Sequence, residues 1–210
     1  MPRANYDALM QALIDRLPKD GPRPKLLLHC CCAPCSTAAM ERLHQAFDIT
    51  VYYYNPNIDT AAEHDLRARE LQDFTARSGL ADEAVILPYD PDAYLAAIRG
   101  LEQEPEGGAR CQRCFALRLR QAARYAAQHG YDYFTTTLTI SPLKNAALLN
   151  ALGEQIGGEE GIPFLNSDFK KRGGYLRSTE LSHAYGIYRQ DYCGCAFSKA
   201  ARDRRREQTG

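Results

Sequence analysis

The chain has 210 residues, enough for one domain with a substantial core, and its 45% hydrophobic and 25% charged residues are ordinary for a globular protein. Lysine plus arginine and aspartate plus glutamate number 26 each, so the net charge favours no class of partner. No stretch approaches the roughly 18 unbroken apolar residues of a membrane helix. The charged N-terminal segment also lacks the pattern of a signal peptide. We therefore expect a cytoplasmic protein without membrane association.

Helices and strands are expected to alternate along the first half of the chain. Apolar residues at helical spacing predict an amphipathic helix over residues 4–17. The apolar run at 25–30 predicts a buried strand, which leads into a helix over about 36–47. The next expected elements are a strand at 49–54, a charged helix at about 60–77, a strand at 83–87 and a short helix at 92–99.

The second half continues this alternation after a loop at 103–110, which is rich in Gly, Pro and Glu. Its expected elements are a helix at 111–128, a strand at 133–138, a helix at 144–156, a short strand at 163–165 and a helix at 177–185. Residues 199–210 are expected to form a basic, loosely ordered tail. The order of elements indicates a single α/β domain over 1–210, with a mostly parallel sheet flanked by helices.

Cysteine is the informative residue type, and its eight positions fall into three clusters. The clusters are 30, 31, 32 and 35; 111 and 114; and 193 and 195. The cytosol keeps thiols reduced, so metal binding or catalysis explains these clusters better than structural disulfides do. Burial as small apolar side chains would explain one or two positions only. The first cluster follows the strand at 25–30, and α/β folds form their sites at the carboxyl ends of strands, near the point where the strand order reverses.

Cys111 and Cys114 form a C-x-x-C motif at the start of an expected helix. This spacing puts both sulfurs on one side of a helical turn, and the helix N-terminus favours thiolate. Two thiolates from the first cluster would complete either a four-iron cluster or a tetrahedral zinc site. Cys32 and Cys35 supply the second C-x-x-C that zinc sites use. Three adjacent cysteines after a buried strand favour iron–sulfur, with zinc as the alternative.

Cys193-Gly194-Cys195 is a different kind of dithiol. The side chains of two cysteines separated by one residue are poorly oriented to bind the same metal ion. They can instead close a strained disulfide that is easily reduced. We interpret this pair as a redox relay, and two reduced thiols in a loop are the alternative.

Four stretches in this order resemble the motifs of the QueH type of epoxyqueuosine reductase. The run His29–Cys35 is similar to the signature H-x-C-C-A-P-C of that family. The other similar stretches are Cys111–Phe115 with Arg118 and Leu119, Phe134–Leu138 with Ile140–Pro142, and Asp168–Lys171 through Tyr192–Cys195. The resemblance covers about Lys25 to Ser198, which is nearly the whole expected domain.

The resemblance implies an enzyme that reduces epoxyqueuosine to queuosine in a tRNA anticodon loop, the last step of queuosine biosynthesis, on a nucleotide-hydrolase-like (HUP-like) fold. It implies a [4Fe-4S] cluster on four cysteines and a redox-active pair formed by Cys193 and Cys195. The implied cluster ligands are Cys31, Cys32, Cys111 and Cys114. Cys35 stands at a position that suggests a further metal ligand, to a second, mononuclear iron. Cys30 is expected to face the core, and the reaction requires an electron donor of unidentified nature.

The implied substrate gives the basic runs a role. An anticodon loop presents unstacked bases and phosphates. Lys170, Lys171 and Arg172 are therefore predicted to bind substrate phosphates, and the arginines of the tail to add a salt-sensitive attraction. The tyrosines at 52–54 could stack on a base, but alternating residues of a buried strand are more simply core. The conceivable proton donors are His29, Asp59, Tyr175 and Asp191.

Two other classes of protein compete with this hypothesis. One is a zinc-stabilised nucleic-acid-binding module without catalysis. The other is an ATP-using tRNA thiolation enzyme, which needs a glycine- and serine-rich phosphate loop after the first strand. This chain has thiols at that position, so the thiolation enzyme ranks third.

Overall fold

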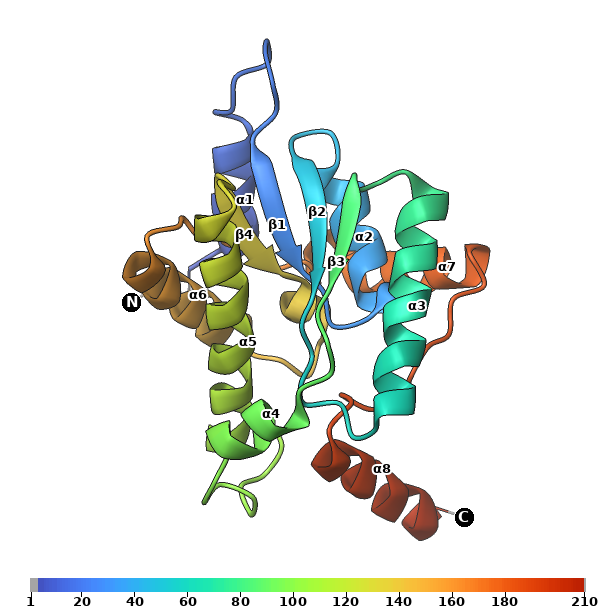
Figure 1. The fold of residues 1–210 in the computed structure, drawn as a ribbon. Coiled ribbons are helices and arrows are strands. Elements are labelled where there is room, and N and C mark those ends of the chain that lie inside the picture. Colours follow the sequence, from blue (N-terminus) through green and yellow to red (C-terminus); the bar gives the residue numbers. More distant parts are fainter. Residues whose placement is uncertain (1–3, 210) are drawn as a thin grey trace.

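A four-stranded parallel sheet lies at the centre of the molecule, with helices on both faces (Figure 1). The computed structural model describes residues 4–209. The strands lie in the order β3-β2-β1-β4, and every neighbouring pair is parallel. They are β1 (Lys25–His29), β2 (Asp48–Tyr53), β3 (Glu83–Ile86) and β4 (Tyr133–Thr136). This sheet confirms the predicted α/β fold, while the HUP-like label stays a prediction.

The fifth strand expected at 163–165 is a single bridge between Phe134 and Phe164. Leu165 still donates its N–H to the Phe134 carbonyl at 2.8 Å. The carbonyl of Leu165 then accepts the Thr135 hydroxyl at 2.8 Å, so a side chain occupies the acceptor that a longer ladder would use.

Alternating side chains of the buried strands build a core on each face of the sheet. Leu26 and Leu28 belong to one core and Leu27 to the other, as the two-residue period of a strand requires. All three tyrosines at 52–54 are buried, which confirms that they are core. The first core lies under α2 (Ala33–Leu43), α3 (Ala61–Ser78) and α7 (Gly174–Ala184), and the second under α5 (Ala109–Gln128) and α6 (Ala146–Glu160) (Figure 1).

Three further helices are α1 (Tyr6–Ile14), α4 (Pro91–Ala97) and α8 (Ala196–Thr209), and short 3-10 turns cover Thr137–Ile140 and Lys171–Gly173. Within residues 4–209, no helix combines the length and the apolar character that crossing a bilayer requires. Local signals explain where helices begin and end. In α3, the Thr60 hydroxyl accepts the N–H of Glu63 at the start, and Gly79 ends the helix at φ 63°.

Residues 199–209, which we expected to form a loosely ordered tail, belong to the helix α8. Ion pairs with distant acidic residues hold this helix in place. Lys199 Nζ lies 2.7 Å from Asp59, and Arg202 lies 2.6 Å from Asp191. Gly210, the last residue of the expected tail, lies outside the described residues.

A chain of hydrogen bonds joins the carboxyl ends of β1 and β4. Thr136 Oγ1 accepts the N–H of Leu138 at 3.2 Å, so its own hydrogen is free to point at His29 Nδ1, 2.8 Å away. His29 Nε2 then donates to the carbonyl of Tyr54 at 3.3 Å. Burial, assisted by the charge of Arg118, lowers the pKa of His29 to about 3. This histidine is therefore a neutral core residue with both ring nitrogens satisfied.

Replacing Thr136 by Val should lower the free energy of unfolding by about 1–3 kcal/mol, because it leaves a buried ring nitrogen and a buried N–H without partners. Chemical denaturation followed by circular dichroism measures this loss. Thr136→Ser keeps the hydroxyl and is the matched control, which should retain most of the stability. Equal stability of the Val variant and the wild type would contradict the hydrogen-bond chain.

Candidate metal centre

The site lies where the strand order reverses. β2 and β4 flank β1 on opposite sides, so the chain leaves the carboxyl ends of β1 and β4 in different directions and a crevice remains between them. The cysteine run begins directly after β1. The turn after β4 meets it there, because the N–H of Cys31 points at Thr137 Oγ1, 3.5 Å away.

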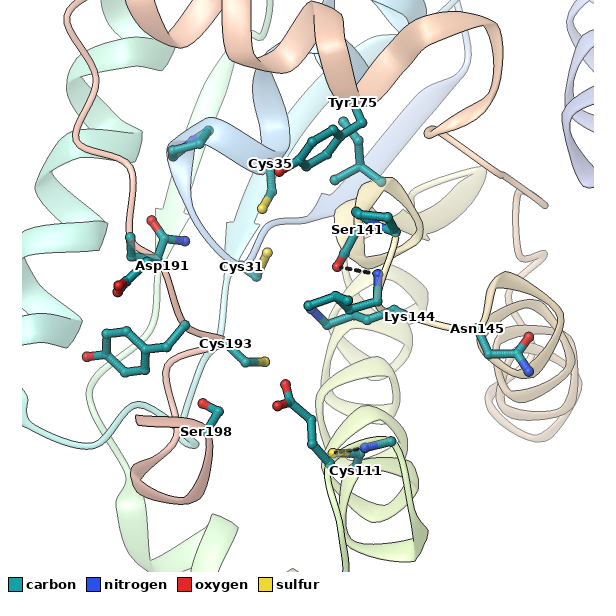
Figure 2. Close-up of a pocket in the computed structure, with 18 of the residues that line it drawn as sticks. Cys31, Cys35, Cys111, Ser141, Lys144, Asn145, Tyr175, Asp191, Cys193 and Ser198 are labelled. Atoms are coloured by element: carbon teal, nitrogen blue, oxygen red, sulfur yellow. Dashed lines mark hydrogen bonds between the residues drawn. The ribbon is translucent and has the colours of Figure 1, made fainter. Parts of the chain in front are cut away.

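A pocket of about 310 Å³, the thiol pocket, opens at this point. Figure 2 shows that thiols from three separate stretches of the chain line it: Cys31 and Cys35, Cys111, and Cys193. Its remaining wall comes from the loop Ser141–Asn145, the start of α7 and residues 189–192. The pocket therefore collects one or more members of each predicted cysteine cluster.

The sulfurs of Cys31, Cys32 and Cys35 lie within 4.8 Å of one another, a spacing at which they could hold one metal ion. Hydrogen bonds from Cys32 and Cys35 hold the pKa of Cys31 well below its usual range, and the charges of Lys144 and Arg118 act in the same direction. Burial raises the pKa of Cys32 to about 12, and the bond to Cys31 keeps Cys35 protonated. Without metal, Cys31 is a thiolate that accepts hydrogen bonds from the thiols of Cys32 and Cys35.

Cys111 and Cys114 lie in the first turns of α5, as the sequence predicts. The N–H of Gly107 donates to Cys111 Sγ at 3.2 Å, and this thiol lines the pocket. Cys114 is buried deeper, where it packs with Cys195 and Tyr94. Burial raises the pKa of both α5 thiols, to about 12 for Cys114. Deprotonating them for metal binding thus requires compensating positive charge.

The members of the Cys193–Cys195 pair are free thiols that face different surroundings. Cys193 lines the thiol pocket, whereas Cys195 is buried and caps α8. Its sulfur accepts the N–H of Ser198 at 3.4 Å. Gly194 has φ +120°, and a Cβ there would lie 2.9 Å from Arg67 Nη1. Only glycine therefore fits between the two cysteines.

Three basic side chains surround the thiols: Arg118, which belongs to the second sequence motif, and Arg67 and Lys144, which sequence reasoning did not single out. Arg118 and Arg67 are only 1% and 2% exposed, and each keeps one buried N–H without a hydrogen-bond partner in the part of the chain that the structure describes. Arg118 lies against Cys114, four residues earlier on α5, and Arg67 stacks 5.0 Å from the ring centre of Tyr192. Lys144 lines the pocket, and within residues 4–209 its ammonium has no acceptor at hydrogen-bond distance.

Comparison with known proteins places the chain in a family. A sequence model of the family described as epoxyqueuosine reductase QueH matches residues 26–201. The chain therefore belongs to the QueH family. Its relative from Staphylococcus epidermidis, named epoxyqueuosine reductase QueH, is 44% identical over 202 residues, covering 93% of this chain and 85% of the relative. The relative of the same name from Streptococcus pyogenes is 44% identical, covering 93% of this chain and 78% of the relative. The one from Thermotoga maritima is 34% identical, covering 82% of this chain and 89% of the relative.

The residues around the thiol pocket fit the anionic iron–sulfur cluster implied by resemblance to the QueH family. Thiolate is the ligand that such clusters use, and Cys31, Cys35 and Cys111 from the first two motifs line this pocket. Among residues 4–209, the sulfurs already within 4.8 Å of one another are those of the first motif, Cys31, Cys32 and Cys35. The unpartnered N–H groups of Arg67 and Arg118 are buried donors that suit negatively charged sulfur. Cys30 faces away from this arrangement, since its thiol is fully buried and donates to the Leu28 carbonyl at 3.3 Å.

The three residues predicted to bind phosphates lie outside the thiol pocket, and two of them have internal partners. Lys170 Nζ lies 2.7 Å from Asp168 and donates to the carbonyl of Thr139 at 3.0 Å. Arg172 lies 2.9 Å from Asp7. Lys171 is exposed and, among residues 4–209, has no such partner for its ammonium. Their role in binding substrate stays a prediction, and Lys171 is the residue best placed for it.

The four conceivable proton donors differ in their access to the pocket. His29 is buried and neutral behind the thiols. Asp59 is held by Lys199 and Tyr192, and Asp191 by arginines of α8. Tyr175 lines the pocket with a side chain that is 46% exposed. Asp191 also lines the pocket, but Arg202 and Arg206 hold its carboxylate, which favours Tyr175 as the proton donor.

In the metal-free protein, Cys31 should be the first thiol of its trio to react with iodoacetamide. Its lowered pKa keeps it a thiolate, so its labelling rate should change little between about pH 6 and pH 8. Cys32, with a pKa of about 12, should stay slow over this range. Peptide mass spectrometry measures both rates. Lys144→Gln should slow labelling of Cys31, and faster labelling of Cys32 than of Cys31 would contradict the assignment.

Proposed function

We propose that this protein reduces epoxyqueuosine to queuosine in the anticodon loop of a tRNA, the last step of queuosine biosynthesis, in the cytoplasm. Besides family membership, one structural observation supports this proposal. Thiols from three segments at least 76 residues apart in the sequence line one pocket beside two buried arginines with unpartnered N–H groups. Such a concentration of thiols and buried positive charge suits a redox cofactor.

The proposed cofactor is a [4Fe-4S] cluster. Cys31, Cys32, Cys111 and Cys114 would hold it, and Cys35 would bind a second, mononuclear iron beside it. When bound, such centres supply electrons one at a time and a Lewis acid for oxygen. Arg67 and Arg118 would compensate the negative charge of the thiolates, because both lie buried beside them.

The reaction balance indicates what the chain itself must provide. Converting the epoxide to an alkene breaks two C–O bonds and consumes two electrons and two protons, with the oxygen leaving as water. Closing a disulfide between Cys193 and Cys195 releases two electrons and two protons, which matches this demand. We propose that the pair works as this relay and is reset by an external electron donor, its second partner after tRNA.

Two residues of the pocket suit the departing oxygen. Lys144 presents an ammonium without an internal acceptor, so it can stabilise negative charge that develops on the oxygen. Tyr175 presents a hydroxyl group at the pocket wall and can donate a proton. Lys170, Lys171 and Arg172 are proposed to contact phosphates of the tRNA, outside the pocket.

Replacing Cys111 or Cys114 by Ala should remove most of the bound iron and the broad visible absorbance of anaerobically purified protein. Each variant loses one of the four proposed ligands. Cys30→Ala is the matched control, because this thiol points into the core, and it should keep its iron. A colourless wild-type protein that contains zinc would instead favour the zinc-stabilised binding module. Full iron retention by both α5 variants would refute the ligand set.

Replacing Cys193 by Ser should leave the iron content unchanged and abolish multiple turnover, because the relay loses one thiol while the ligands remain. The comparison of iron content with steady-state rate measures this separation. Loss of iron together with activity would show that Cys193 is a structural ligand.

The direct test of the proposed function is mass spectrometry of tRNA from a strain that lacks this protein. Epoxyqueuosine should accumulate in place of queuosine, and the wild-type gene should restore queuosine. Normal queuosine in the deletion strain, with no other reductase of this activity present, would overturn the proposal.

A further inference from the structure

One loop separates the thiol pocket from a second pocket of about 720 Å³. The second pocket lies between the start of α1, this loop and residues 168–171. The loop residues Pro142, Leu143, Lys144 and Asn145 line both pockets. The loop therefore forms a ridge between the two pockets, and a ligand that occupies both pockets must cross this ridge.

Leu143 stands on this ridge and is 83% exposed, the most exposed large apolar side chain of the residues that the structure describes. Local hydrogen bonds hold the ridge rigid. The N–H of Leu143 points at Ser141 Oγ at 3.3 Å, and that of Lys144 at the Ser141 carbonyl at 3.2 Å (Figure 2). Asn145 caps α6 by accepting two N–H groups, at 2.9 and 3.2 Å. The side chain of Leu143 is thus left without packing inside the protein at the border of both pockets.

Positive charge lies on both sides of the ridge. Lys144 faces the thiol pocket, and Lys171 lines the second pocket; within residues 4–209 neither ammonium has an internal acceptor. The wall of the thiol pocket also includes Tyr175, whose ring Arg189 covers at 5.9 Å from its centre. An apolar wedge between two cations, with an aromatic ring in the same pocket, is complementary to a single strand of nucleic acid, whose bases alternate with phosphates.

We propose that Leu143 is a wedge that separates the target nucleoside from its neighbour in the substrate strand. The target base enters the thiol pocket, whose volume suits one ligand of nucleoside size. The adjoining nucleotide enters the second pocket, with its phosphate near Lys171. The inserted leucine replaces the stacking that the two bases lose, as enzymes that extrude a base require. This inference rests on the proposed function and adds to it the element that selects a nucleotide within a strand.

Leu143→Ala tests the wedge, and Leu176→Ala is the matched control, since Leu176 is 63% exposed but lines neither pocket. Both substitutions change exposed side chains, so both variants should fold. Reduction is measured on tRNA and on the free epoxyqueuosine nucleoside. Leu143→Ala should lower kcat/KM for tRNA by about tenfold, the scale of one lost base contact. It should lower kcat/KM for the free nucleoside much less, because the free nucleoside has no neighbouring base from which to be separated. Leu176→Ala should change neither.

A second measurement reports the wedge without turnover. A tRNA anticodon stem-loop carries 2-aminopurine beside the target position, and its fluorescence rises when the base unstacks. Wild type and Leu176→Ala should raise the signal on binding, and Leu143→Ala should not. Equal signals and equal kcat/KM for all three proteins would overturn the wedge. Absence of reduction by the wild type on both substrates would refute the proposed function, and the fluorescence would still decide on the wedge.

Discussion

The contact between the carboxyl ends of β1 and β4 is the constraint on which the rest of the site depends. The neutral ring of His29 accepts from Thr136 and donates to the backbone beyond β2, so the two strand ends cannot drift apart. The cysteine run and the turn after β4 start from this fixed point and face each other. A charged or unpartnered histidine would break the link, because no water reaches it. A core residue thus sets the geometry of a redox pocket that it does not line.

Positive charge is the second requirement of this pocket, and the fold meets it with arginines from two helices. Arg67 comes from α3 and Arg118 from α5, which lie on opposite faces of the sheet (Figure 1). Buried guanidinium groups are unfavourable unless anionic groups accompany them, and buried thiols resist ionisation unless cations do. The buried arginines therefore favour ionisation of the thiols, and the thiolates offset the cost of burying the arginines.

The sequence predicts the structural elements that depend on neighbouring residues, and it misses the features that depend on contacts with distant residues. The apolar run ending at His29 and the C-x-x-C spacing at Cys111 are local patterns, and both elements form as expected. The helix α8 was missed, and the contact that ties its first turn to the domain, between Lys199 and Asp59, joins residues about 140 positions apart. Lys144 carried no signal, since a loop lysine is ordinarily solvated, and only the tertiary fold turns it toward the thiols.

The unpartnered N–H groups of Arg67 and Arg118 would link the stability of the fold to the proposed anionic cofactor. A group that binds only the folded chain stabilises it in proportion to the logarithm of its concentration, so occupancy and folding form one equilibrium. A cell short of that group would then contain a less stable protein as well as an inactive one. Proteolysis of the unliganded chain would follow, and abundance of the protein would report on the assembly of its cofactor.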